Sequence, residues 1–107
     1  MDSLDVFGFI KPLVDVHTMG MYTIANLLRD CGYKVVIAED KINEAVEKIQ
    51  KINNYSLIKR WIIENNITRI GFSYRLDPQE GCDYFMKLYL QLQSDNMFVE
   101  RGGPIKE

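Results

Sequence analysis

The stretch FIKPLVDVHTMGMYTIANLLRDCGYKVVIAED, residues 9–40, contains the pattern that decides the fold. An apolar run over residues 5–10 leads into a polar loop, and residues 33–40 are continuously apolar at their centre, which is typical of a strand covered on both faces. Between them, residues 21–32 have apolar side chains at helical spacing before a glycine. The predicted apolar stripe of this helix consists of Ile24, Leu27, Leu28 and Cys31. Strand, helix and strand in this order predict a βαβ unit with parallel strands.

The same alternation continues along the rest of the chain. The further predicted elements are helices over 41–52, 57–66 (with Ser56 as N-cap) and 82–96, and strands over 68–73 and 97–103. This alternation predicts the α/β class: an open, doubly wound parallel sheet of the flavodoxin-like or Rossmann-like kind, in one domain of residues 1–107. Ligands of such sheets bind beyond the carboxyl ends of the strands. We therefore expect the loops 15–20, 74–81 and 102–107 to converge on one edge.

Composition excludes several classes of partner. The chain has 107 residues, 13 of them basic and 15 acidic, with a formal net charge of -2. No basic stripe follows the sequence, so nucleic acid is not an expected partner. No apolar run has the length of a membrane span, so no membrane partner is expected either. The two cysteines lie far apart in the sequence, so we expect reduced thiols in a cytoplasmic protein.

The one histidine, His17, stands two residues after Asp15 and three before Gly20. A lone histidine in such a loop is more often structural, as a cap or a satisfied polar group. The alternative is a metal ligand, because a neutral imidazole binds transition metals and donates its other N–H to a nearby carboxylate. A single histidine cannot hold a bare metal ion, but it can bind a metal that a macrocycle already carries.

The stretch D-V-H-T-M-G, residues 15–20, matches the D-x-H-x-x-G signature of cobalamin (vitamin B12)-binding domains. The chain resembles the domain of cobalamin-dependent methionine synthase and of the glutamate mutase small subunit. Family domains also have a serine after the third strand and a glycine pair after the fourth, which Ser73, Gly102 and Gly103 match. Where the family has a leucine two residues after the serine, this chain has Arg75. The family's last strand and helix follow the glycine pair, and the chain is expected to lack them.

The resemblance implies a cofactor and a site. Cobalamin would bind with its own base detached from cobalt, and His17 would be the lower axial ligand and the sole protein ligand to the metal. Asp15 would orient His17 by a hydrogen bond, and Ser73 would bind the detached nucleotide tail. The implied cofactor-binding residues are Asp15, His17, Thr18, Met19, Gly20, Ser73, Gly102 and Gly103. None of them is assigned a catalytic role.

The implied function is that of a carrier domain or subunit rather than an enzyme by itself. It would present methylcobalamin or adenosylcobalamin to a substrate-binding catalytic domain or subunit, for methyl transfer or radical rearrangement. A homodimer is compatible with this reading. The alternative is a degenerate cobalamin-binding-like domain that acts as a non-catalytic interaction or regulatory module, which the altered serine motif and the missing last unit favour.

Overall fold

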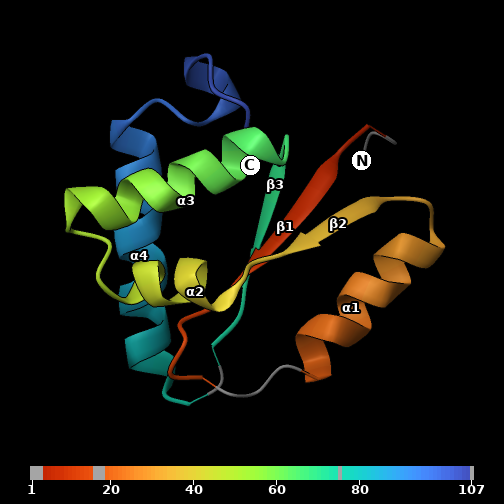
Figure 1. Ribbon diagram of the computed structural model, residues 1–107, viewed down its shortest axis with the longest axis horizontal. Helices are drawn as coiled ribbons and strands as arrows, with labels where there is room; N and C mark the ends of the chain where they lie inside the picture. Colours follow the sequence, from red (N-terminus) through yellow and green to blue (C-terminus); the bar gives the residue numbers. More distant parts are fainter. Residues whose placement is uncertain (1–3, 16–18, 75, 107) are drawn as a thin grey trace.

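Three parallel strands form the centre of the protein. The structure is a computed structural model that describes residues 4–15, 19–74 and 76–106. The strands are β1 (Val6–Ile10), β2 (Lys34–Ile37) and β3 (Arg69–Phe72), and their order in the sheet is β2-β1-β3 (Figure 1). The predicted α/β class with an open parallel sheet, flavodoxin-like or Rossmann-like, is confirmed.

Helices cover both faces of this sheet. They are α1 (Met19–Asp30), α2 (Asp40–Glu47), α3 (Ile52–Glu64), α4 (Pro78–Ser94) and the short 3-10 helix η1 (Val99–Arg101). Figure 1 shows α1 on one side of the sheet and the three other α-helices on the opposite side, as right-handed crossovers in two directions require. No helix within the described ranges is long and apolar enough to span a membrane.

The main core lies between the sheet and helices α2, α3 and α4. Val6 and Ile10 of β1 point into it, whereas Gly8 between them leaves room for neighbouring side chains. A Cβ atom on Gly8 would lie 2.6 Å from a methyl group of Ile67 and 3.0 Å from the ring of Trp61. The absence of a side chain at the middle of β1 therefore allows the helical layer to pack closely against the sheet.

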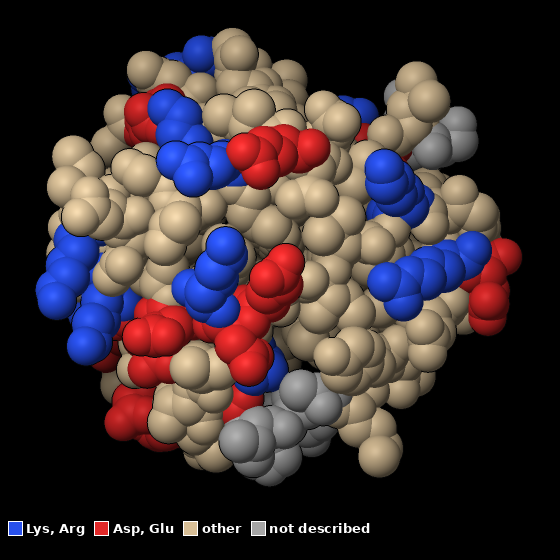
Figure 2. All heavy atoms as spheres, in the orientation of Figure 1, with Lys and Arg blue, Asp and Glu red and all other residues tan. Residues whose placement is uncertain are grey.

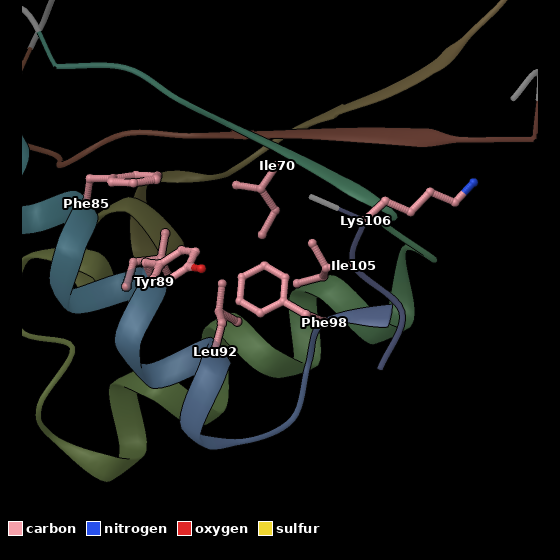
Figure 3. A pocket seen from close by; sticks show the side chains of 8 residues that line it. Ile70, Phe85, Tyr89, Leu92, Phe98, Ile105 and Lys106 are labelled. Atoms are coloured by element: carbon pink, nitrogen blue, oxygen red, sulfur yellow. The ribbon is translucent and has the colours of Figure 1, made fainter. Parts of the chain in front are cut away.

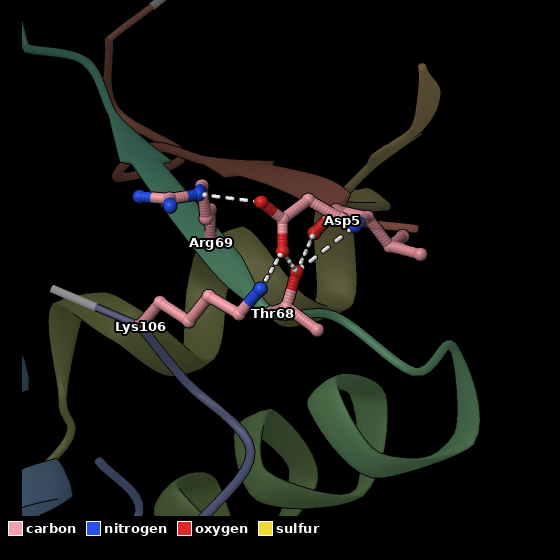
Figure 4. A network of polar contacts seen from close by, with 5 residues as sticks. Asp5, Thr68, Arg69 and Lys106 are labelled. Carbon is pink, nitrogen blue, oxygen red and sulfur yellow. Dashed lines mark hydrogen bonds and ion pairs between the residues drawn. The ribbon is translucent and has the colours of Figure 1, made fainter. Parts of the chain in front are cut away.

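A buried carboxylate links the amino ends of β1 and β3. Asp5 has a fully buried side chain and accepts hydrogen bonds from Thr68 Oγ1 at 2.9 Å and Arg69 Nε at 3.0 Å. Lys106 Nζ lies 2.6 Å from Asp5 Oδ1, the oxygen that also accepts from Thr68, whereas Arg69 contacts Oδ2. Figure 4 shows these contacts. This network joins the start of β1, the start of β3 and the C-terminal segment.

Three helix boundaries differ by four or more residues from the sequence-based prediction. The predicted helix 41–52 ends at Glu47, and α3 begins at Ile52 with Lys51 as its N-cap, so Ser56 lies inside the helix. The last helix begins at Pro78 rather than at residue 82. There the Asp77 side chain accepts a hydrogen bond from the Glu80 N–H at 3.3 Å, and proline suits the first helical position.

The buried face of the first helix is not its most apolar stripe. The structure turns Met21 and Ala25 to the sheet, whereas Ile24 is 52% exposed and Leu27 is 62% exposed. Helix α1 packs chiefly on β2, and that contact selects a helix face one residue away from the most apolar stripe. The apolar stripe that indicated the helix in the sequence is therefore largely at the surface.

The fourth strand predicted over residues 97–103 does not form. Phe98 makes only an isolated bridge with Ile105, and η1 follows directly. The Val99 N–H donates to the Ile105 carbonyl at 2.8 Å, and the Ile105 N–H donates to the Met97 carbonyl at 2.9 Å. The segment thus closes on itself, because its own turn satisfies the backbone groups that a strand would have offered to β3.

We predict that Asp5→Ala lowers the free energy of unfolding by about 1–3 kcal/mol, since it leaves two cations facing each other without their carboxylate. Lys59→Ala is the matched control, because its pair with Asp95 is partly exposed on both sides and exposed pairs contribute about 0–1 kcal/mol. Denaturant unfolding of both variants checks this. Equal losses in the two variants would contradict the role given to Asp5.

Candidate functional site

The candidate site lies at the carboxyl ends of β1 and β3. From β1 the chain crosses to β2 on one side, and the later crossover returns to β3 on the other side. Loops that leave the sheet in opposite directions open a crevice between them, which is where open α/β sheets bind ligands. The Ser73 N–H donates to the Ile10 carbonyl at 3.2 Å, so the two loops begin side by side.

The loop after β1 starts with a closed, buried turn. The Asp15 N–H donates to the Pro12 carbonyl at 3.1 Å. Lys11, only 6% exposed, extends its ammonium group to the main-chain carbonyls of Pro12 and Asp15. Asp15 itself has no exposed surface. A cation inside the turn therefore satisfies carbonyl groups that the turn withdraws from water.

Helix α2 fixes this turn from outside. The Lys11 N–H donates to Asn43 Oδ1 at 3.2 Å, and Asn43 Nδ2 donates to the Ala38 carbonyl at 3.3 Å. The Val14 N–H donates to Glu47 Oε1 at 3.0 Å. Neither Asn43 nor Glu47 was among the site residues predicted from the sequence. The available signal was an asparagine beside Ile42 on the buried side of an otherwise apolar helix face.

A tyrosine pair lies just beyond the carboxyl end of β3. The Tyr74 hydroxyl donates to Glu80 Oε2 at 2.6 Å, and its ring lies 5.5 Å from that of Tyr84. The hydrogen bond to Glu80 is the main reason that the pKa of Tyr74 is raised, and the charge of Asp15 adds to it. Burial, followed by the charges of Glu47 and Glu80, raises the pKa of Tyr84. The charges of Asp15, Glu47 and Glu80 therefore all raise the pKa of one or both of these tyrosines.

The surface around this edge is acidic. Figure 2 shows Asp and Glu side chains gathered over α2 and the amino-terminal part of α4. Among the residues that the structure describes, no three His, Cys, Asp or Glu side chains come together as a metal-binding group. The described part of the edge thus offers carboxylates and hydroxyl groups, but no metal centre built from protein alone.

Four of the predicted site residues lie at this edge. Ser73 follows β3 directly, Asp15 ends the turn after β1, and Met19 and Gly20 begin α1. Met19 is 82% exposed, and Gly20 and Ser73 are half-buried. His17 and Thr18 lie outside the described residues.

The glycine pair lies elsewhere. The Gly103 N–H donates to the Phe98 carbonyl at 2.9 Å, beyond the end of α4, and the Lys106 N–H donates to the Thr68 carbonyl at 2.6 Å. Thr68 precedes β3, so this segment meets the amino end of the sheet. The expectation that all three loops converge on one edge was therefore wrong for residues 102–106. Antiparallel packing of α4 against β3 carries the chain back to the opposite edge before Gly102 is reached.

An apolar cavity of about 330 Å³ lies between β3 and α4 (Figure 3). Its lining is Ile70, Phe85, Leu88, Tyr89, Leu92, Phe98, Ile105 and Lys106. The Phe85 and Tyr89 rings lie 6.2 Å apart, and the Tyr89 and Phe98 rings lie 5.2 Å apart. The cavity follows the free side of β3, and its volume is at the lower end of the range for small-molecule pockets.

Comparisons with known proteins add no relative. No protein-family model matches the chain, and neither a curated protein nor a solved structure matches it. The geometry of the edge and the sequence motif are therefore the grounds for a functional proposal.

We predict that Gly103→Ala destabilises the protein through the local turn. A Cβ atom at this position would lie 2.1 Å from the carbonyl carbon of Met97, so the backbone must move. The expected loss is about 1–3 kcal/mol in the free energy of unfolding. Pro104→Ala, at an exposed neighbouring position, is the control. Thermal unfolding measures both, and a Gly103→Ala variant as stable as the control would refute this account of the turn.

We also predict that Glu80→Gln lowers the pKa of Tyr74 toward the ordinary tyrosine value of 10.0. Removing the carboxylate charge makes the phenolate easier to form. Because the pKa is raised in the folded protein, the contribution of this contact to stability is present below the ordinary tyrosine pKa and is lost at higher pH. Alkaline titration by tyrosinate absorbance checks the shift. In a Tyr74→Phe background, Glu80→Gln should cause no further change in the alkaline titration. A shift that persists there would belong to another tyrosine.

Proposed function

We propose that this chain binds cobalamin through the loop that follows β1, with His17 as the lower axial ligand of cobalt. The observation that supports the proposal best is the fully buried Asp15 at the end of the turn after β1, together with the Ser73 N–H that donates to the Ile10 carbonyl at the end of the same strand. The two parts of the chain that the D-x-H-x-x-G signature and the serine motif identify thus begin at the same edge.

The groups at this edge suit the lower face of such a cofactor. A carboxylate that accepts a hydrogen bond from a metal-bound imidazole fixes its tautomer and raises its basicity. Asp15 stands two residues before His17, on a turn that Lys11 stabilises from inside. Bound cobalamin would supply methyl-transfer or radical chemistry, and the residues of this chain would hold and orient it.

The glycine pair does not fit this site. Gly102 and Gly103 lie beyond the end of α4, and Gly103 packs against the backbone of Met97. The proposal therefore includes Asp15, His17 and Ser73 and gives no role at the cofactor to the glycines. The protein would act as a carrier, whose bound cofactor is used by a partner that holds the substrate.

A second candidate function is that of a non-catalytic interaction module. It is favoured by the exposed apolar side chains of α1, where Met19, Ile24 and Leu27 are all more than half exposed. Exposed apolar side chains of this kind are one feature of protein contact surfaces. On this reading the altered serine motif would reflect a domain that no longer binds the cofactor.

The test is binding of hydroxocobalamin to the purified protein, followed by gel filtration and the visible spectrum of the protein peak. We expect the wild-type protein to retain the cofactor with a shifted spectrum. His17→Ala should lose the shift, since it removes the axial ligand. Asp15→Asn should weaken binding about 10- to 100-fold, as changes next to a metal ligand do. Asn26→Ala, on the exposed side of α1, should bind normally.

Circular dichroism of each variant distinguishes loss of binding from loss of fold. A colourless peak from folded wild-type protein would contradict the proposal and favour the interaction module. Normal binding by His17→Ala with an unchanged spectrum would also contradict it, because cobalt would then have another lower ligand.

A further inference from the structure

We infer that Asn43 and Glu47 of α2 are the positioning residues of this site: their side chains fix the turn that leads from β1 to Asp15. The inference rests on the proposed function only where cobalamin binding is the readout, because the hydrogen bonds that carry it are properties of the free protein. It assigns a role to residues outside the D-x-H-x-x-G signature.

Asn43 joins the ends of two strands. Its Oδ1 accepts the Lys11 N–H at 3.2 Å, just after β1, and its Nδ2 donates to the Ala38 carbonyl at 3.3 Å, just after β2. The residue is 4% exposed, so both polar atoms need these partners. An amide side chain provides a donor and an acceptor together, which neither aspartate nor leucine of similar size does.

Glu47 holds the next part of the turn. Its Oε1 accepts the Val14 N–H at 3.0 Å. Because Asn43 and Glu47 are four residues apart in a helix, their side chains leave α2 on the same face. Together they bind the N–H groups of Lys11 and Val14, which lie on either side of Pro12 and Leu13. The ammonium group of Lys11 supports the turn from inside.

The packing of α2 therefore sets the position of the turn. Ile42, Ala45 and Val46 of this helix are buried in the main core. A functional loop that is hydrogen-bonded to such a rigid element keeps its geometry better than one held by other loops. The position of Asp15 thus depends on side chains whose own backbone the core immobilises.

The experiment compares Glu47→Ala, Glu47→Gln and Asn43→Ala with Glu44→Ala, an exposed position on the same helix. Glutamine keeps the oxygen that accepts the Val14 N–H, whereas alanine removes it. We expect hydrogen exchange of the Val14 amide to become roughly five- to tenfold faster in Glu47→Ala and to stay near wild type in Glu47→Gln and Glu44→Ala. Asn43→Ala should speed exchange of the Lys11 amide in the same way.

Hydroxocobalamin affinity is the second readout. We expect it to fall about 10-fold or more in Glu47→Ala and Asn43→Ala, with recovery in Glu47→Gln. Unchanged amide exchange in Glu47→Ala, or equal losses in Glu47→Gln and Glu47→Ala, would overturn the inference. If the wild-type protein does not bind hydroxocobalamin, the proposed function fails, and amide exchange still decides the positioning role. If Asn43→Ala does not fold, the partly exposed Glu47 still provides the decision.

Discussion

The central place of β1 is the constraint on which the rest of the structure depends. β1 pairs with β2 on one edge and with β3 on the other, and its residues alternate between buried and half-buried positions. Because both neighbours are parallel to β1, each connection must cross over a face of the sheet, and the two crossovers run in opposite directions. Gly8 in the middle of the strand lets Ile67 and Trp61 close over it. The helical cover on both faces of the sheet and the divergence of the loops are both consequences of this arrangement.

The same constraint positions the candidate site. The crossovers on the two sides of β1 run in opposite directions, so the carboxyl end of this central strand lies at the switch point of the sheet. Here that end continues into the buried turn of Lys11–Asp15. The turn is costly to bury, since it contains an ammonium group, main-chain carbonyls and a carboxylate. Asn43, Glu47 and the internal contact of Lys11 offset that cost. A buried polar turn with this many hydrogen bonds is more typical of a functional loop than of an ordinary connection between strands.

Local sequence patterns predicted the three strands, the α/β class and the edge that carries Asp15 and Ser73. They failed where tertiary packing decides between local options. The segment 97–103 has strand-like composition, but hydrogen bonds from Val99 and Ile105 close it into a turn. Helix α1 buries the face of Met21 and Ala25 rather than its most apolar face. No local signal shows that Asn43 reaches two strand ends, because that contact depends on where α2 packs.

The most direct test of the central claim uses the fact that the chain has one histidine. Protein made with 15N-labelled histidine would be loaded with cobalamin, reduced to the Co(II) state and studied by electron paramagnetic resonance. Our account predicts that the axial nitrogen splitting changes from the triplet of 14N to the doublet of 15N, because His17 supplies that nitrogen. A triplet that persists in the labelled protein would show that the cofactor keeps its own base on cobalt, and it would contradict the account.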